Sequence, residues 1–268
     1  LIIKSVDVDK FNTNPDYGVD MKKRKLKKED ILSERKGIQC LIFDFDGTLA
    51  ETEEAHRNAF NKAFNSNKMN WYWDQHIYKK LLQVAGGKER IEFYNKSFLS
   101  HSKQLSRIDI EEIHFQKTKF YSQSVSQGFV KLRPGIREFL EKAKNNKKKL
   151  AISTSTSRDN VNLLLRSCLK ENPEDVFSFI STGDLVEKKK PSPDLYKLVL
   201  AEMNLMPEEC LAFEDSRIGL VAAKRANIKT AVNPSQYSME DNLDEADYFL
   251  TSFLLEQFPK SLRRILSL

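Results

Sequence analysis

The chain has 268 residues and a formal net charge of +6. This length can bury one large core, or a core with a smaller inserted unit. No stretch approaches the roughly 18 apolar residues that a membrane span needs, so we expect no span. A net charge this modest does not indicate a broad nucleic-acid surface, so we expect no nucleic-acid partner.

The first 36 residues form a basic N-terminal extension ahead of the first strand-like run. Residues 1–36 hold 10 Lys/Arg and 7 Asp/Glu, including KKRKLKK from Lys22 to Lys28. Such a run is typical of a solvated tail, and docking on an anionic partner is the alternative. We predict that the protein is a monomer. Residues 1–36 could also dock on a partner protein.

From Gln39 onward, short apolar runs alternate with helical patterns. Runs of five or six nearly apolar residues are typical of strands buried on both faces. Strand and helix in alternation favour an α/β class, a Rossmann-like core with a parallel sheet and helices on both faces. The predicted strands are CLIFDF (40–45), KLAIST (149–154), FSFIST (177–182), CLAFED (210–215) and IKTAV (228–232).

The helical patterns between these strands have apolar residues three and four apart. SRDNVNLLLRSCL and DSRIGLVAAKRAN follow the second and fourth predicted strands. In KKPSPDLYKLVLAEM, Ser192 suits an N-cap and Pro193 the first helical position.

Residues 51–129 break the alternation and contain no convincing strand. ETEEAHRNAFNKAFN and IYKKLLQVA each carry an apolar helical stripe. We therefore expect an all-helical cap domain at 51–129, inserted into a catalytic core made of 37–50 and 130–268. Trp71 and Trp73 are assigned to the interior of the cap.

The three cysteines, Cys40, Cys168 and Cys210, are far apart and form no C-x-x-C pair. A disulfide framework and a zinc site are therefore not expected. Cys40 and Cys210 each begin an apolar run, which favours buried free thiols.

Two aspartates, Asp44 and Asp46, follow the first predicted strand in DFDGTLAETE. Side chains at i and i+2 of an extended chain leave the same face, so both can reach one site. Two carboxylates about 4 Å apart repel by roughly 4 kcal/mol at an effective dielectric of 20. A hard, oxygen-binding cation such as Mg²⁺ would remove that repulsion.

Other polar residues stand at the ends of the neighbouring predicted strands. Glu214 and Asp215 end the fourth strand, Thr154 ends the second, and Lys190 precedes a proline after the third. Each alone has an ordinary explanation: a solvated turn, a helix cap, a surface lysine. Ligands of parallel α/β sheets bind beyond the carboxyl ends of the strands, so the combination predicts a site there.

These residues make the chain resemble the haloacid dehalogenase superfamily. The resemblance rests on DFDGT, a threonine after a hydrophobic strand, KP and ED, and it covers about residues 39–250. It implies a phosphoryl-transfer enzyme that uses Mg²⁺, with the helical insertion as its cap. Dehalogenases lack the second aspartate, so Asp46 favours phosphate chemistry.

The resemblance implies a role for each of these residues. Asp44 would attack phosphorus to form an aspartyl phosphate, and Asp46 would act as general acid and base. Thr154 and Lys190 would bind the phosphoryl oxygens. Because residues 153–157 (the hydroxyl run) all carry hydroxyls, the motif hydroxyl could also belong to the residue just before or just after Thr154. The Mg²⁺ ligands would be Asp44, the backbone carbonyl of Asp46, Asp215 and Glu214.

The cap narrows the resemblance to the CbbY-type phosphatases, which hydrolyse xylulose 1,5-bisphosphate, an inhibitor of Rubisco, to xylulose 5-phosphate. AETEEAHRNAFN, WYW and GGKER carry it in the cap, and AFEDSRIGL and STSTSRDNV in the core. It implies a sugar bisphosphate as the small-molecule partner. It also implies a Calvin-cycle role, in the plastid stroma of a eukaryote or in the cytoplasm otherwise.

A bisphosphate needs an anchor for the phosphate that is kept. Gly86 and Gly87 allow close backbone approach, and a helix that begins near Lys88 would direct free N–H groups at an anion. Glu51 and His56 could bind sugar hydroxyls. Arg158 and the neighbouring hydroxyls could reach a phosphate at the boundary between cap and core. The full set of predicted substrate-binding residues is Glu51, His56, Gly86, Gly87, Lys88, Arg90, Ser155, Thr156 and Arg158, with a surface histidine as the alternative for His56.

Two other functions remain open at this stage. A sugar-phosphate mutase of the β-phosphoglucomutase type shares the core motifs and a similar cap. A non-catalytic subunit that docks through its basic extension is the alternative from another class, and the intact acids and lysine argue against it.

Overall fold

The computed structural model describes residues 37–100 and 104–267. The basic extension 1–36 and its docking role lie outside the described residues. Within the described ranges, no helix is both long and apolar enough to cross a bilayer.

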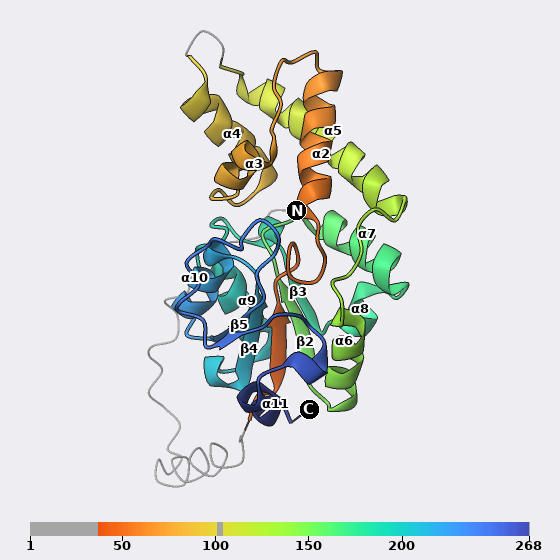
Figure 1. The fold of residues 1–268 in the computed structure, drawn as a ribbon, viewed down its shortest axis with the longest axis vertical. Helices are drawn as coiled ribbons and strands as arrows, with labels where there is room; N and C mark the ends of the chain where they lie inside the picture. Colours follow the sequence, from red (N-terminus) through yellow and green to blue (C-terminus); the bar gives the residue numbers. More distant parts are fainter. Residues whose placement is uncertain (1–36, 101–103, 268) are drawn as a thin grey trace, which may run out of the picture. The chain divides into compact units, whose positions relative to one another are not determined.

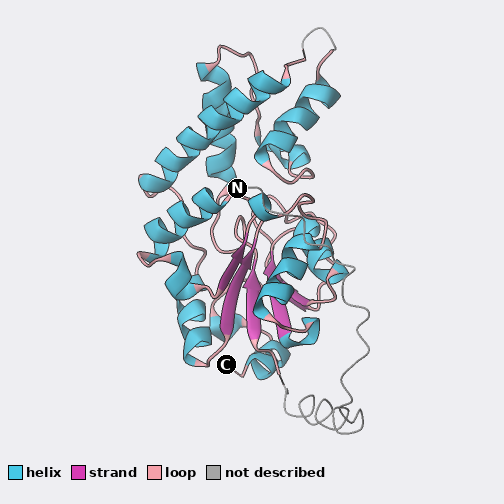
Figure 2. Ribbon diagram, turned by 180° about the vertical axis from the view of Figure 1, so that it is seen from behind, coloured by secondary structure: helices cyan, strands magenta, loops and turns pink. Residues whose placement is uncertain are grey.

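A six-stranded parallel sheet forms the centre of the fold (Figure 2). Its spatial order is β3-β2-β1-β4-β5-β6. The strands are β1 (Cys40–Phe43), β2 (Lys149–Ser153), β3 (Phe179–Ser181), β4 (Cys210–Glu214), β5 (Lys229–Val232) and β6 (Tyr248–Phe249). The five predicted strands are confirmed. Strand β6 was not predicted from the sequence; it has only two residues, neither of them buried.

Helices cover both faces of the sheet, which confirms the predicted α/β class (Figure 1). Leu41 and Phe43 of β1 belong to the hydrophobic cluster on one face, and Cys40 and Ile42 to that on the other. The first face is covered by α6 (Ile136–Asn145), α7 (Arg158–Leu169) and α11 (Lys260–Leu266), and the second by α9 (Asp194–Met203) and α10 (Arg217–Arg225).

Smaller elements complete the core. The short helix α8 (Pro173–Val176) precedes β3, and the 3₁₀ turns are η2 (Gly183–Leu185), η3 (Pro207–Glu209) and η4 (Leu255–Gln257). Helix α9 begins at Asp194 with Pro193 at its N-cap, so the prediction of Ser192 as N-cap is wrong by one residue. Proline fixes φ near the helical value, so Pro193 is compatible with the N-cap as well as with the first helical position. All three cysteines are free, and Cys40 and Cys210 are buried, as expected.

Four helices lie between β1 and α6. The described residues of this segment, 51–100 and 104–129, form no strand. The helices are α2 (Glu53–Ser66), α3 (Gln75–Leu81), α4 (Gly87–Phe98) and α5 (Arg107–Ser126). They share a hydrophobic cluster, which Tyr237 of the core joins, in which Phe60, Phe64 and Trp73 are fully buried and Trp71 packs against them. On this basis we propose the domain boundaries stated above, with 51–129 as cap.

Candidate active site

The register of the central strands brings the predicted acids together. Phe43 of β1 pairs with Phe213 of β4, and the Asp44 backbone N–H donates to the Phe213 carbonyl at 2.9 Å. The side chains that follow these strands therefore start side by side at the carboxyl edge of the sheet. Asp44, Asp46 and Asp215 are among the residues that line a cavity of about 960 Å³ between this edge and the helices of the cap.

Three carboxylates form a compact, buried group at this edge. Asp44, Glu214 and Asp215 each offer an oxygen within 4.8 Å of the others. Burial and the Asp44 charge raise the pKa of Glu214 to about 7 against the pull of Lys190, and the same two causes raise that of Asp215 well above its usual value. Glu214 Oε2 is buried and accepts no hydrogen bond from the described residues. Such a set fits a hard divalent cation such as Mg²⁺.

The turn after β1 allows these acids to approach closely. Gly47 has φ +84°, and a Cβ there would collide with the Asp215 carboxylate. Only glycine adopts this conformation without strain and leaves the space free.

Lys190 supplies the positive charge in the cluster. Its Nζ donates to Asp44 Oδ1 at 2.7 Å, to Glu214 Oε1 at 2.6 Å and to the Ser153 carbonyl at 2.7 Å. Burial alone would lower the pKa of Lys190, but the Asp44 and Glu214 carboxylates outweigh it and raise the pKa. The lysine is therefore charged at neutral pH and offsets part of the acidic charge.

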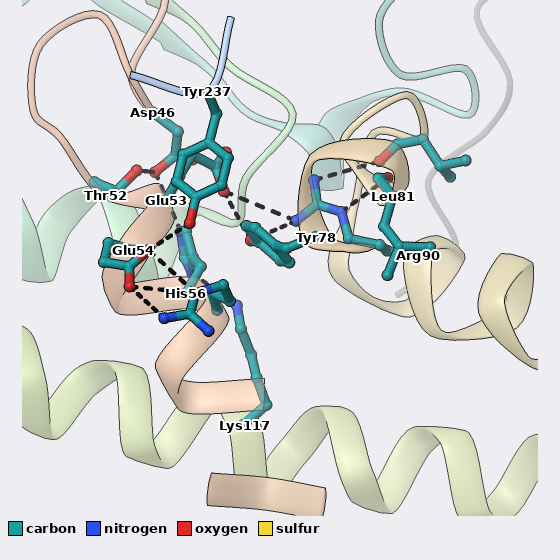
Figure 3. A network of polar contacts seen from close by, with 12 residues as sticks. Asp46, Thr52, Glu53, Glu54, His56, Tyr78, Leu81, Arg90, Lys117 and Tyr237 are labelled. Atoms are coloured by element: carbon teal, nitrogen blue, oxygen red, sulfur yellow. Dashed lines mark hydrogen bonds and ion pairs between the residues drawn. The ribbon is translucent and has the colours of Figure 1, made fainter. Parts of the chain in front are cut away.

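The Asp46 carboxylate is not part of the three-acid group but belongs to a polar chain that runs into the cap (Figure 3). Thr52 Oγ1 donates to Asp46 Oδ1 at 2.6 Å, and His56 Nε2 lies 3.3 Å from the same oxygen. Lys117 Nζ lies 2.8 Å from His56 Nδ1. An ammonium only donates, so Nδ1 accepts and Nε2 carries the proton toward Asp46.

His56 is a buried residue of this chain and not a surface histidine. Burial and the Lys117 charge hold its pKa well below the usual range, so the ring is neutral. The ring also stacks on Tyr121 at a centroid distance of 3.9 Å. Thr52 and Lys117 were not predicted from the sequence. Lys117 lies 61 residues after His56, and no local pattern connects the two.

Lys117 should make stability depend on pH in the alkaline range. Burial and the Arg90 charge lower its pKa from 10.5 to about 8. The unfolded chain then binds more protons between these two values, so the free energy of unfolding should rise with pH there, by up to about 3 kcal/mol. Urea unfolding at pH 7.5 and pH 10 should reveal this rise in the wild type and not in Lys117→Met.

Lys119→Met is the matched control, because Lys119 is an exposed lysine on the same helix. It should keep the pH dependence of the wild type. Parallel pH profiles for the wild type and Lys117→Met would contradict the assignment.

Arg90 lines the cavity and also holds the cap together. Its Nε donates to the Leu81 carbonyl at 3.3 Å, and its NH1 donates to the Tyr78 hydroxyl at 2.9 Å. The Tyr78 hydroxyl in turn donates to Glu53 Oε2 at 2.7 Å. Glu53 lines the cavity but was not predicted from the sequence, where Glu51 was the predicted residue.

Two predicted substrate-binding residues do not lie with the others. Glu51 Oε1 is 3.3 Å from Arg133 Nε, and Arg158 NH2 donates to Glu174 Oε1 at 2.6 Å. Neither is among the described residues that line the cavity. Those that do line it, besides the acids and Lys190, are His56, Gly86, Gly87, Lys88, Arg90, Thr154, Ser155 and Thr156.

Four of the five residues in the hydroxyl run, Thr154 to Ser157, line the cavity. Thr154 is buried, its backbone N–H donates to the Ser181 carbonyl at 3.0 Å, and its Oγ1 accepts from the Thr156 backbone N–H at 3.2 Å. Thr154 lines the cavity, and Ser153 is not among the lining residues described. This placement favours Thr154 over Ser153 as the motif hydroxyl.

Comparison with known proteins agrees with this geometry. A family model described as haloacid dehalogenase-like hydrolase matches residues 41–233, more than half of the chain. The chain belongs to the haloacid dehalogenase-like hydrolase family. This match confirms the predicted fold, and together with the CbbY relatives described next it confirms the prediction of a phosphatase.

Relatives of this haloacid dehalogenase-like hydrolase include Protein CbbY of Cereibacter sphaeroides, 42% identical over 81% of this chain and 93% of the relative. The CBBY-like protein of Arabidopsis thaliana is 34% identical over 78% of this chain and 67% of its own length. A crystal structure of a CbbY mutant from Rhodobacter sphaeroides, in complex with xylulose 1,5-bisphosphate, matches with a TM-score of 0.77 and 40% identity. It covers 81% of this chain and 96% of that one.

Proposed function

We propose that the protein is a Mg²⁺-dependent sugar-bisphosphate phosphatase that converts xylulose 1,5-bisphosphate to xylulose 5-phosphate. The observation that carries this proposal is a single cavity lined by the acid cluster and, in the cap, by Lys88 and Arg90 beside a glycine turn. One end suits the phosphate that is cleaved, and the other the phosphate that is kept. The sugar bisphosphate bound by the related CbbY structure supports this choice.

The reaction would begin at Asp44, whose carboxylate lies at the end of the central strand. One Asp44 oxygen attacks phosphorus and forms an aspartyl phosphate, while Asp46 protonates the leaving sugar oxygen. Asp46 then takes a proton from the water that hydrolyses the intermediate, and Asp44 is regenerated. Burial raises the pKa of Asp46 although Thr52 and Lys117 oppose it, which helps Asp46 to hold a proton before attack.

Charge compensation would allow an anionic nucleophile to meet an anionic phosphate. Lys190 contacts Asp44 and is within reach of a phosphoryl group on it, and Thr154 offers a hydroxyl. Asp44, Asp215 and the Asp46 carbonyl would hold Mg²⁺, with Glu214 beside them. When bound, Mg²⁺ would supply positive charge to the phosphoryl oxygens.

The kept phosphate would bind where the cap faces the core. Gly86 is the N-cap of α4 and Gly87 is its first residue, and the first N–H groups and positive dipole end of this helix favour an anion. Lys88 is exposed and lines the cavity, and Arg90 lines it from a buried position. Glu53, which lines the cavity, suits a sugar hydroxyl. His56, predicted for the same role, has both ring nitrogens engaged by Lys117 and Asp46, so it would orient Asp46 instead.

Metal removal should abolish activity. EDTA should stop phosphate release, and added Mg²⁺ should restore it. Asp215→Asn should raise the Mg²⁺ concentration for half-maximal activity on the order of 100-fold, because it removes a charged ligand. Asp159→Asn, at an exposed position of α7, should leave that concentration unchanged. An unchanged Mg²⁺ requirement in Asp215→Asn would contradict the proposed ligand set.

A substrate panel tests the function. Phosphate release should be measured with Mg²⁺ on xylulose 1,5-bisphosphate, ribulose 1,5-bisphosphate and six-carbon sugar monophosphates. The proposal predicts the highest kcat/KM for xylulose 1,5-bisphosphate. A clear preference for a six-carbon monophosphate, with an isomerised product, would favour the mutase. No turnover of any phosphate ester would favour a non-catalytic subunit.

The same proposal implies a cellular context. An enzyme that removes a Rubisco inhibitor belongs with the Calvin cycle, and therefore in the plastid stroma if the source is eukaryotic. The similarity to a plant protein supports that option. A monomer remains our proposal for its oligomeric state.

A further inference from the structure

The consecutive residues Lys189 and Lys190 contact different carboxylates. Lys190 Nζ contacts the acid cluster, whereas Lys189 Nζ lies 2.5 Å from Glu89 Oε1 in the first turn of α4. Burial would raise the pKa of Glu89, but the hydrogen bonds from Lys189 and from the Glu89 backbone N–H outweigh it and lower the pKa. The Glu89 carboxylate is therefore ionised at neutral pH, and its contact with Lys189 joins the core to the cap.

Lys189 lies between the hydroxyl run of the core and the glycine turn that is proposed to bind the kept phosphate. A Cβ at Gly183 would lie 3.2 Å from Lys189 Cε and would also collide with the Ser155 carbonyl, so the lysine stem passes the hydroxyl run. A Cβ at Gly86 would lie 2.9 Å from Lys189 Nζ and would collide with the Glu89 carboxylate. The lysine thus extends from Ser155 in the core to the glycine turn in the cap. All of these residues except Gly183 line the cavity.

Two polar atoms on this path lack a partner. Glu89 Oε2 and Ser155 Oγ are buried and have no hydrogen-bond partner among the described residues. Buried polar atoms are normally hydrogen-bonded, and an unpaired one costs free energy. Lys189 carries three N–H donors, and one hydrogen bond from them, to Glu89, is found in the described structure. The Ser155 hydroxyl and the other Lys189 N–H groups are therefore donors available to an acceptor-rich ligand, whereas Glu89 Oε2 is itself an acceptor and would have to turn away from such a ligand.

We propose that Lys189 is a specificity-determining residue that binds the second phosphate of the substrate, and that the Glu89 carboxylate holds this lysine until the phosphate displaces it. This inference rests on the proposed function. A phosphate dianion has more negative charge and more acceptor oxygens than a carboxylate, so it can bind Lys189 and the Ser155 hydroxyl together.

The exchange is physically easy because the existing pair is only half-buried. The side chains of Lys189 and Glu89 are 27% and 43% exposed, and ion pairs with this much exposure are weak. The displaced Glu89 carboxylate can turn to solvent. A monophosphate without the second charge would leave the pair intact, so the pair discriminates between the two substrate classes.

The test compares variants on xylulose 1,5-bisphosphate and on p-nitrophenyl phosphate. Lys189→Ala should lower kcat/KM for the bisphosphate about 10- to 100-fold, mainly through KM, as expected when a charge-assisted hydrogen bond is lost. Its kcat/KM for p-nitrophenyl phosphate should fall only a few fold. Lys189→Arg should retain most of the bisphosphate preference. Lys188→Ala is the matched control, since Lys188 is exposed and is not among the lining residues, and it should match the wild type on both substrates.

Glu89→Gln separates binding from simple cap attachment. Removal of the competing carboxylate charge should lower KM for the bisphosphate severalfold and strengthen competitive inhibition by inorganic phosphate. If the pair served only to hold the cap on the core, Glu89→Gln would lose as much activity as Lys189→Ala on both substrates, and the inference would be overturned.

The wild type and Lys189→Ala together distinguish failure of the proposed function from failure of this inference. A wild-type enzyme without a preference for bisphosphate would overturn the proposed function, and this inference with it. A wild type that has the preference, together with a Lys189→Ala variant that keeps it, would overturn this inference alone.

Discussion

Asp44→Asn should reduce the turnover of every phosphate ester on the order of 10⁴-fold or more, because the amide cannot attack phosphorus. Asp44 is buried at the end of the central strand, with Lys190 at 2.7 Å. The amide is nearly isosteric, so the fold should persist, as circular dichroism and the urea midpoint would verify. The measurement is phosphate release at saturating substrate and Mg²⁺.

Asp159→Asn controls for a general effect of losing one acid, and it should keep wild-type turnover. A second readout concerns the intermediate. After acid quench, the wild type should retain phosphate from labelled substrate on the protein, whereas Asp44→Asn should retain none. Near-normal turnover in Asp44→Asn would refute nucleophilic catalysis by this residue.

Asp46→Asn should lower kcat for sugar phosphates about 10²- to 10⁴-fold, the range expected for loss of general acid–base catalysis. The effect should depend on the leaving group. Departure of p-nitrophenolate needs no proton, so the first step on p-nitrophenyl phosphate should remain fast. Hydrolysis of the aspartyl phosphate should be slow, since no base activates the water.

Rapid-mixing kinetics of Asp46→Asn on p-nitrophenyl phosphate should therefore give a burst of one p-nitrophenolate per enzyme before a slow steady rate. Thr52→Val should have a milder defect, because it removes only the 2.6 Å hydrogen bond to Asp46. Equal losses on both leaving groups, without a burst, would contradict the assigned role.

The fold and the acid cluster could be predicted because they follow from local patterns. Apolar runs of five or six residues identified each longer strand, and parallel pairing forces their carboxyl ends to one edge. Asp44 and Asp215 meet because Phe43 pairs with Phe213. Strand β6 gave no such signal, since two partly exposed residues leave no apolar run.

The cap residues that line the cavity could be predicted less well. The spacing of apolar residues shows which side of a helix is buried, but not which side faces the cavity. Glu51 and Glu53 are both near the start of α2, but Glu51 pairs with Arg133 and only Glu53 lines the cavity. Arg158 follows the hydroxyl run in sequence yet pairs with Glu174. Lys117 reaches His56 from another helix, a contact that only tertiary packing determines.

The proposed enzyme hydrolyses one particular phosphate of a sugar bisphosphate. Phosphorus NMR can follow the purified chain with Mg²⁺ and xylulose 1,5-bisphosphate in a single time course. We expect the C1 phosphate signal to disappear while inorganic phosphate grows to one equivalent, and the C5 phosphate signal to remain. Loss of the C5 phosphate, or a new sugar-phosphate isomer without stoichiometric inorganic phosphate, would contradict the proposed reaction.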